Sequence, residues 1–167
     1  MKKSKVTEEL ESFTLPAWNE IPDVGLYLDQ VSKYINSYLG DYDMGVTPSM
    51  ISNYVKLKII SREGRKIYSR ERIAALIFVA VTKTILSMDQ IRDALTQFSA
   101  SGTNEEWYGE FVEALRKHIR ELEQHSSFPQ PAKDDSGSLM SVITAAAAFK
   151  IYLDTYFRGL PKETTAE

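Results

Sequence analysis

Hydrophobic residues recur at every third or fourth position along much of the chain, a pattern typical of amphipathic helices. The first such stretch covers residues 24–39, with Asp23 as its expected N-cap and the Gly- and Asp-rich segment 40–45 as its end. The positions expected to face the core are Val24, Tyr27, Leu28, Val31, Tyr34, Ile35, Tyr38 and Leu39.

A short helix is predicted over residues 48–56. Thr47 can accept a hydrogen bond from an open backbone amide, and Pro48 needs no amide partner at the first helical position. Its inner face consists of Ile51, Tyr54 and Val55. The opposite face carries small polar residues and ends in a base: Ser49, Ser52, Asn53 and Lys56.

Segment 59–68 has β-branched residues at both ends and Glu-Gly in its centre. This pattern predicts a β-hairpin of two short strands joined by a tight turn. The bases expected near the tip of the hairpin are Arg62, Arg65 and Lys66.

The rest of the chain is predicted to be helical. Ser69 is the expected cap of a helix that is apolar on most sides and therefore central. Two capping-box patterns, at Ser87 with Gln90 and at Thr103 with Glu106, predict two further helix starts.

The second of these helices is expected to end near Gln124 and to turn Trp107 and Phe111 inward. A loop is expected at 126–138, and a last helix over 139–157.

Charge is distributed unevenly along the chain. Residues 46–72 contain seven Lys and Arg and two acids, a net charge of +5, whereas the other 140 residues have 13 bases and 21 acids, a net charge of −8. A local positive segment on an acidic protein indicates a local anionic partner, of which nucleic acid is the commonest.

Several classes of protein are disfavoured by the sequence. It has no Cys, which excludes disulfides and thiolate metal sites. The basic start lacks the apolar stretch of a signal peptide, and the longest apolar run, 73–81, is too short to cross a bilayer, so we expect a cytoplasmic protein without membrane contact. No phosphate loop, dinucleotide fingerprint or nucleophile with an evident base is found, so we expect neither an enzyme nor a cofactor.

The order of short polar-faced helix and basic ribbon suits a DNA-binding protein. Asn53 can both donate to and accept from an adenine edge, and the small Ser49 and Ser52 would let the helix approach the bases. Expected phosphate contacts are Lys56, Lys58, Arg62, Arg65, Lys66, Arg70 and Arg72. The last two lie in the first turn of a helix, where the macrodipole disfavours a base unless an anion compensates it. The alternative is an ordinary solvated charged face.

The run VTPSMISNYV at 46–55, then LKII, RKIYSRERI and LSMDQIRDAL, resembles the winged helix-turn-helix of the MerR family. With LPAW and IPDVGLYLDQV before it, the whole chain also resembles an uncharacterised bacterial family with a domain of unknown function, thought to be MerR-like. Ser52 stands where MerR proteins usually have Arg, and Lys58 where they usually have Gly.

The MerR resemblance implies a mainly α protein with a winged helix-turn-helix, a short β-hairpin wing and additional C-terminal helices. The expected organisation is a mobile N-terminal tail at 1–20 that Leu15 and Trp18 attach to the core, a DNA-binding domain at 21–98 and a helical part at 104–160. The helical part either forms a homodimer or completes the core, two alternatives that amphipathicity leaves equal.

The implied function is that of a bacterial transcriptional regulator that binds duplex DNA as a homodimer through the recognition helix 48–56 and the basic wing 62–66. The alternative is a protein-interaction or small-ligand module on the same scaffold without DNA binding. A small-molecule effector is compatible with either. A metal site at His118, Glu121 and His125 is a weak candidate because no fourth ligand is evident, and we expect no metal.

Overall fold

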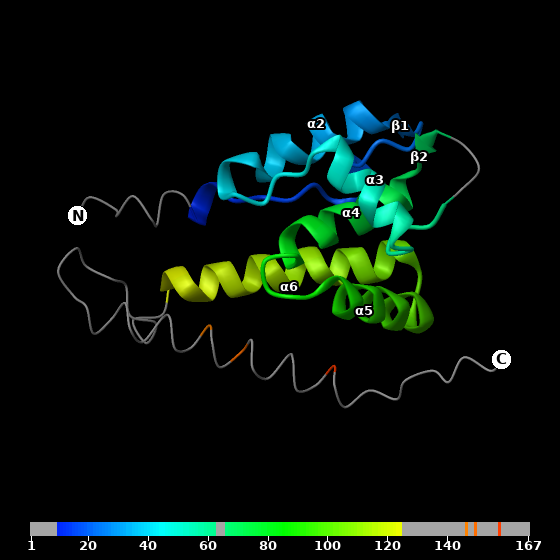
Figure 1. Cartoon of the computed structure of the whole chain (residues 1–167). Coiled ribbons are helices and arrows are strands. Elements are labelled where there is room, and N and C mark those ends of the chain that lie inside the picture. The colour runs from blue at the N-terminus through cyan, green and yellow to red at the C-terminus, as the bar shows by residue number, and fades with distance from the viewer. Residues whose placement is uncertain (1–9, 63–65, 125–145, 147–148, 150–156, 158–167) are drawn as a thin grey trace. The chain divides into compact units, whose positions relative to one another are not determined.

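The computed structural model describes residues 10–62 and 66–124, together with the isolated positions 146, 149 and 157 (Figure 1). The chain divides into two compact units, Met1–Gln124 and His125–Glu167. All the helices and strands delimited below belong to the first unit, which is mainly helical and includes a two-stranded antiparallel sheet.

Three of the predicted features fall on other parts of the chain. Residues 1–9 of the expected tail, the loop expected at 126–138 and the helix expected over 139–157 lie outside the described residues, except for positions 146, 149 and 157 of that helix.

Helix α2 spans Leu28–Leu39 and begins later than predicted. Its N-cap is Tyr27, whose backbone N–H donates to Gln30 Oε1 at 2.9 Å, so the prediction that Asp23 caps the helix is wrong. Val24 and Tyr27 precede the helix and are exposed, at 81% and 59%, rather than facing the core as expected. Val31, Ile35 and Leu39 are completely buried, which confirms these positions of the stripe, whereas Leu28, Tyr34 and Tyr38 are half-buried.

The reason for the late start is a strand. Strand β1, Leu26–Tyr27, pairs antiparallel with strand β2, Ile67–Tyr68, in the register Leu26 to Tyr68 and Tyr27 to Ile67. Gly25 permits this approach because its φ is +76° and a Cβ at that position would lie 2.2 Å from Ile67 Cγ2. The pairing connects distant segments of the chain.

The predicted hairpin within 59–68 is therefore wrong. Its second strand exists as β2, but β2 pairs with β1, and Ile59–Arg62 forms no strand. The backbone N–H groups of Ile59 and Ile60 both donate to Tyr54 O, at 3.0 and 3.3 Å. They belong to the end of the preceding helix and are not available to a strand ladder.

Helix α3, Pro48–Lys56, has the predicted bounds. It follows the short 3-10 helix η2, Gly40–Tyr42, which lies in the segment expected to end α2. Thr47 Oγ1 accepts from Met50 N at 3.2 Å, which confirms the predicted cap. Ile51 and Tyr54 are buried, as expected for the inner face.

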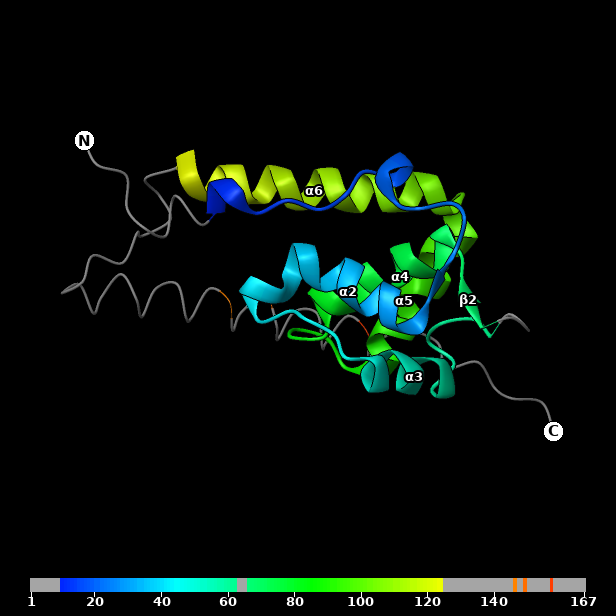
Figure 2. The ribbon, with the colours of Figure 1, turned by 90° about the horizontal axis from the view of Figure 1, so that it is seen from above.

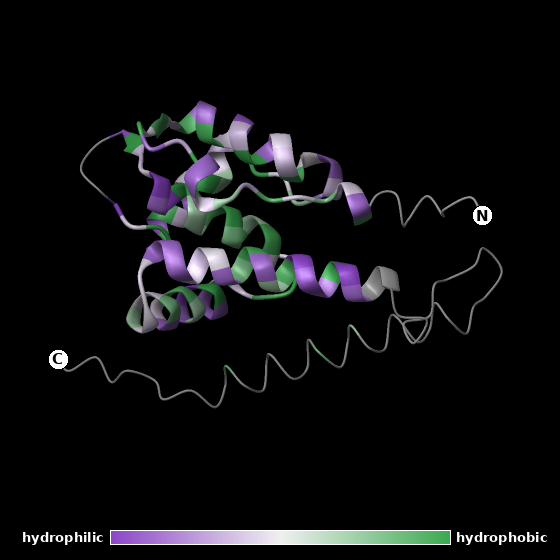
Figure 3. Ribbon diagram, turned by 180° about the vertical axis from the view of Figure 1, so that it is seen from behind, coloured by the Kyte–Doolittle hydropathy of each residue, from purple (hydrophilic) through white to green (hydrophobic). Residues whose placement is uncertain are grey.

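Helix α4, Arg70–Thr82, packs against α2, α5 and α6 and is the central helix of the unit. Most of its residues are buried, which confirms the prediction from its continuous apolar character. Figure 3 shows hydrophobic positions on the inner helices and mostly hydrophilic ones along the outer α6. Ser69 occupies the N-cap position, but its side chain makes no cap hydrogen bond and its Oγ is buried without a partner, so the predicted capping role is not fulfilled.

Helices α5, Met88–Ser101, and α6, Asn104–Gln124, begin where the sequence predicts. Ser87 Oγ accepts from Gln90 N at 3.2 Å, while Ser87 N donates to Gln90 Oε1 at 2.9 Å. Thr103 N donates to Glu106 Oε2 at 2.7 Å, and Glu106 N donates to Thr103 Oγ1 at 3.3 Å. Both predicted capping boxes are confirmed.

Aromatic side chains join α4, α5 and α6. The ring of Trp107 lies 6.0 Å from each of the rings of Phe78 and Phe98, and Phe111 lies 5.1 Å from Phe78. Trp107 is 6% exposed within its own chain. Of the two alternatives left open by the sequence, intramolecular packing therefore holds for this residue.

The segment before α2 is attached to α6. Leu15 is buried, and Tyr108, which is completely buried, donates its hydroxyl hydrogen to Pro16 O at 2.9 Å. The 3-10 helix η1, Trp18–Glu20, follows and packs on α6. Leu15 thus has the anchoring role expected from the sequence. Across the described part of the chain, we find no helix with the length and apolarity that a membrane span requires.

Candidate nucleic-acid interface

The outer face of α3 is polar and accessible. Ser49, Asn53 and Lys56 are exposed and Ser52 is half-buried, as the helical spacing predicts. Figure 2 shows α3 on the other side of α2 and α4 from α6. The helix contains no acidic residue, so its outer face combines short hydrogen-bonding side chains with a single positive charge.

The C-terminal end of α3 has an unusual backbone conformation. Lys58 has φ = +57°, in the left-handed region. The N–H of Lys58 donates to Val55 O at 3.1 Å and that of Ile59 to Tyr54 O at 3.0 Å. These two bonds define a Schellman motif, in which the left-handed position normally holds Gly. The MerR resemblance places Gly at the same position, and the structure shows why Gly would be favoured there.

A contact that the sequence did not predict holds this end of the helix. Arg92, in the first turn and a half of α5, donates from Nη2 to Leu57 O at 3.0 Å and from Nη1 to Asp89 Oδ1 at 2.8 Å. A charged donor on a terminal carbonyl is favourable because the C-terminal end of a helix carries partial negative charge. Since Arg92 and Leu57 are far apart in sequence, no local pattern points to this contact.

Positive side chains gather around a hollow beside this end of α3, which we call the cationic hollow. Its volume is about 450 Å³. It is lined by Ser52, Val55, Lys56, Lys58, Ile60, Ser61, Arg62 and Tyr68. Three of these residues are bases and none is an acid. Among the described residues, no ion pair involves Lys56, Lys58 or Arg62. An anion in the hollow would therefore meet uncompensated positive charge.

Arg72 does not belong to the accessible set, and the prediction that it contacts phosphate is wrong. It is 5% exposed, its Nη1 donates to Ile67 O at 3.0 Å, and its guanidinium carbon lies 4.0 Å from the centre of the Tyr68 ring. These contacts direct the side chain back over β2. Arg72 thus holds the β2–α4 connection and is not available to an external polyanion.

Arg70 also has partners inside the protein. Its Nε donates to Ile21 O at 2.8 Å, its Nη2 lies 3.9 Å from Asp23 Oδ2, and its guanidinium lies 5.8 Å from the Trp18 ring. Asp23 thus offsets part of the charge of Arg70 in this first turn. The structure takes Arg70 away from α3 and toward the segment before α2.

Two further predicted contacts are Lys66, which follows residues 63–65, and Arg65, which is one of them. Lys66 is exposed and directly precedes β2. Arg65 lies outside the described residues. The structure therefore places Ser52, Lys56, Lys58 and Arg62 together, with Ser49 and Asn53 on the same helix.

The pKa values of several buried groups move away from their ordinary values. Burial raises the pKa of Tyr54 on the inner face of α3, and burial followed by the neighbouring Tyr38 raises that of Tyr34. Burial lowers the pKa of Lys83, an effect that Asp43 partly offsets. Tyr34 donates its hydroxyl hydrogen to Glu20 O at 3.2 Å. The Tyr34 phenol serves as a neutral hydrogen-bond donor, which is a structural role.

Two of the three residues of the weak candidate metal site, His118 and Glu121, contact each other. His118 Nδ1 lies 3.3 Å from Glu121 Oε2 on the exposed side of α6, and His125 lies outside the described residues. No cluster of three potential metal ligands occurs in the part of the chain that the structure describes.

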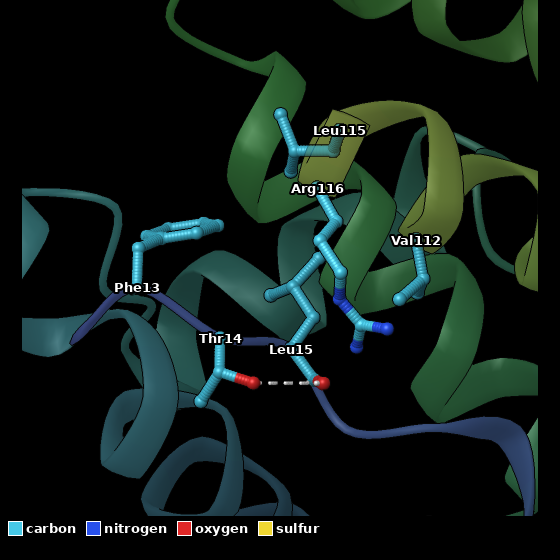
Figure 4. A pocket seen from close by; sticks show the side chains of 6 residues that line it. All are labelled: Phe13, Thr14, Leu15, Val112, Leu115 and Arg116. Atoms are coloured by element: carbon cyan, nitrogen blue, oxygen red, sulfur yellow. Dashed lines mark hydrogen bonds between the residues drawn. The ribbon is translucent and has the colours of Figure 1, made fainter. Parts of the chain in front are cut away.

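A further pocket lies between the N-terminal segment and α6. Figure 4 shows Arg116 extending beside Leu15, with Val112 and Leu115 nearby. Its volume of about 20 Å³ is close to the minimum that a water molecule needs. It is too small for an organic ligand, unlike the cationic hollow.

The sequence profile of the family described as "Domain of unknown function (DUF1836)" matches residues 16–117. The chain belongs to the DUF1836 family. The DUF1836 domain of this chain thus runs from the buried Pro16 into α6 and includes α3 and the cationic hollow. No curated protein and no solved structure matches the chain. The family match confirms the resemblance to a domain of unknown function and has no link to MerR regulators.

Proposed function

We propose that the DUF1836 domain of this chain binds duplex DNA through the outer face of α3 and the cationic hollow, as a bacterial transcriptional regulator acting as a homodimer. In this proposal, α2 and α3 form the helix-turn-helix and α3 is the recognition helix. Arg62 and Lys66, which stand on either side of residues 63–65, take the place of the wing. The homodimer is taken from the MerR resemblance.

The observation that carries the proposal is the cationic hollow with its three bases and no ion pair among the described residues. Unpaired bases beside one another repel, so their grouping has an electrostatic cost that an external anion would remove. A DNA backbone supplies such an anion as a regular row of phosphates. Lys56, Lys58 and Arg62 would contact phosphates at the C-terminal end of α3.

The side chains along α3 suit the other part of the interface. A helix fits the major groove, where Asn53 can make a bidentate contact to adenine and Ser49 and Ser52 can bond to several base edges. All three are on the accessible side of the helix. The short side chains of the two serines would let the backbone of α3 come close to the groove floor.

Binding measured against salt concentration tests the proposal directly. Fluorescence anisotropy of a labelled pool of genomic fragments should show affinity that falls steeply with salt, since each phosphate contact releases counterions. The variant Lys56→Ala/Arg62→Ala should reduce the slope of log K against log salt by about 1.8, which corresponds to about 0.9 for each lost contact.

The matched control is Lys117→Ala. Lys117 is exposed on α6, a helix that lies on the other side of α4 from α3 (Figure 2). Lys117→Ala removes one positive charge, as Lys56→Ala alone does, and should leave the salt slope unchanged, whereas Lys56→Ala alone should reduce it by about 0.9. Binding that is independent of salt, or an equal change of slope in the control, would contradict the proposed interface.

A second candidate function is the binding of a small anionic ligand in the cationic hollow without DNA. The volume of the hollow falls in the range of small-molecule sites, about 300–1,000 Å³. Isothermal titration with inorganic phosphate and with a mononucleotide distinguishes the two. Saturable binding of a mononucleotide, together with no binding of duplex DNA at low salt, would favour this candidate.

A further inference from the structure

A second hollow, separate from the cationic one, lies where four parts of the domain meet. It has a volume of about 320 Å³ and we call it the Trp107 cleft. It is lined by Ile59, Ile60, Ser61, Glu71, Arg72, Ala75, Leu95, Ser99, Asn104 and Trp107. These residues come from the segment after α3 and from α4, α5 and α6.

Arg72 is the notable residue of this cleft. It is 5% exposed, and no carboxylate pairs with it among the described residues. Its Nη1 donates to Ile67 O, whereas its Nε is buried and has no partner. A buried charge without a counterion is costly, and a buried donor without an acceptor adds to that cost. The stacking of the guanidinium on Tyr68 at 4.0 Å offsets only part of it.

The unused edge of the guanidinium has a specific chemistry. Nη1 is occupied by Ile67 O, which leaves Nε and Nη2. These two N–H groups are parallel and match the two oxygens of a carboxylate. A carboxylate in the cleft would therefore supply the counterion that Arg72 lacks and, after a small shift of the guanidinium toward the cleft, the acceptor for its buried Nε.

The walls of the cleft suit an apolar body attached to that carboxylate. Trp107 offers an aromatic surface, and Leu95, Ile59 and Ala75 add aliphatic surface. Trp107 is held by a hydrogen bond from its Nε1 to Asn104 Oδ1 at 3.0 Å. Glu71 also lines the cleft, but it is exposed, so water screens its charge more than that of the buried Arg72.

We infer that the Trp107 cleft binds a small organic carboxylate with a planar apolar body. The carboxylate pairs with Arg72 and the planar body lies against Trp107. Because Ile60 and Ser61 line both this cleft and the cationic hollow, a bound anion lowers the positive potential at the hollow. The ligand consequently weakens the binding of DNA, a part of the inference that rests on the proposed function.

The test is a titration of the full chain with benzoate, in which ¹H–¹⁵N NMR monitors the chemical shifts. The two tryptophan indole signals report on different places, because Trp107 lines the cleft while Trp18 lies in η1 and does not. Millimolar benzoate should shift the Trp107 indole signal and the Ser61 amide in a saturable manner and leave Trp18 unchanged. Benzamide, its neutral analogue, should bind about tenfold more weakly, because it cannot form the charge-assisted pair with Arg72.

Two variants of α5 localise the site without disturbing the core. Ser99 is exposed and lines the cleft, so Ser99→Phe should fill it and abolish the benzoate shift of Trp107. Ala100 is its exposed neighbour and is not part of the lining, so Ala100→Phe should leave the titration unchanged. No shift at Trp107, equal shifts at both tryptophans, or an unchanged titration in Ser99→Phe would overturn the assignment.

The effect on DNA is measured separately. Benzoate should weaken DNA binding about two- to threefold, the size expected of one screened charge about 10 Å away, and benzamide should not. A Trp107 shift without any DNA binding would preserve the carboxylate site and overturn the proposed function. A Trp107 shift with DNA affinity that stays constant would overturn the coupling alone.

Discussion

Lys58 has a backbone conformation that glycine adopts more readily, so Lys58→Gly should stabilise the fold while weakening the proposed interaction with DNA. Its φ of +57° completes the Schellman motif at the end of α3, and its side chain lines the cationic hollow. The backbone of Lys58 therefore lowers the stability of the fold, while its side chain adds positive charge to the cationic hollow. Lys58→Gly should change these two properties in opposite directions: higher stability and weaker DNA binding.

The magnitude follows from the backbone. The left-handed conformation costs a residue with a Cβ about 1–2 kcal/mol, whereas Gly adopts it freely. Gly loses about 0.5–1 kcal/mol more conformational freedom than other residues on folding, which reduces the gain. The free energy of unfolding should therefore rise by about 0.5–1 kcal/mol, or about 1–4 °C in Tm for a chain of this length.

Urea unfolding followed by circular dichroism measures this change, and Lys56→Gly is the matched control. Lys56 also lines the cationic hollow, but it lies within α3 in the normal helical conformation. Its replacement by Gly should lower the free energy of unfolding by about 0.5–1 kcal/mol. Both variants should reduce the DNA salt slope by about 0.9. An equal fall in the free energy of unfolding for Lys58→Gly and Lys56→Gly would refute the assignment of backbone strain to Lys58.

Three further outcomes are expected. Thr47→Ala removes the cap of α3 and should lower the free energy of unfolding by about 1 kcal/mol in urea titrations, while Thr47→Ser should restore most of it. Tyr108→Phe leaves Pro16 O without its donor in the core and should cost about 1–3 kcal/mol; a neutral result would show that water replaces the hydroxyl. Hydrogen bonds from the Thr103 backbone and hydroxyl lower the pKa of Glu106, so this cap contributes stability above the ordinary carboxyl pKa and loses it as pH falls through the lowered value. Hydrogen exchange followed by NMR should show less protection of the Thr103 amide, relative to its intrinsic exchange rate, at that acid pH, and unchanged protection would contradict the coupling.

The features that the sequence predicted well are local ones. The caps at Thr47, Ser87 and Thr103 were predictable because each side chain finds its partner three residues later, whatever the rest of the chain does. The burial of α4 was predictable from its continuous apolar character, since such a helix has no polar side to present to water.

The features that the sequence missed depend on distant parts of the chain. β2 pairs with Leu26–Tyr27 because the amides of Ile59 and Ile60 are already bonded to the end of α3, and periodicity does not reveal such competition. The fate of Arg72 is a similar case. The sequence predicts an exposed side chain for a base in the first turn of a helix. The carbonyl of Ile67 and the ring of Tyr68 nevertheless hold Arg72 inside the protein.

The candidate site was predicted in part for the same reason. Residues on α3 are placed by helical spacing, so the exposure of Asn53 and Lys56 follows from the sequence alone. The grouping of Lys58 and Arg62 around the cationic hollow depends on how the chain leaves the helix, which the Schellman motif determines. The Trp107 cleft combines four separate segments and has no signature in any of them.

The ribbon of β1 and β2 joins segments that lie about forty positions apart, and closing a loop of that length has an entropic cost that few residue pairs can recover. It should therefore open at a lower free energy than the buried turns of α4, so that deuterium enters the amides of Ile67 and Tyr68 before those of Ile77 and Val79. Such an opening would release Ile67 and Tyr68 from β1, whereas α3 would keep the core contacts of Ile51 and Tyr54. In the proposed complex, DNA would then contact the rigid helix α3 first and the β2 segment second, so that binding would proceed in two kinetic steps.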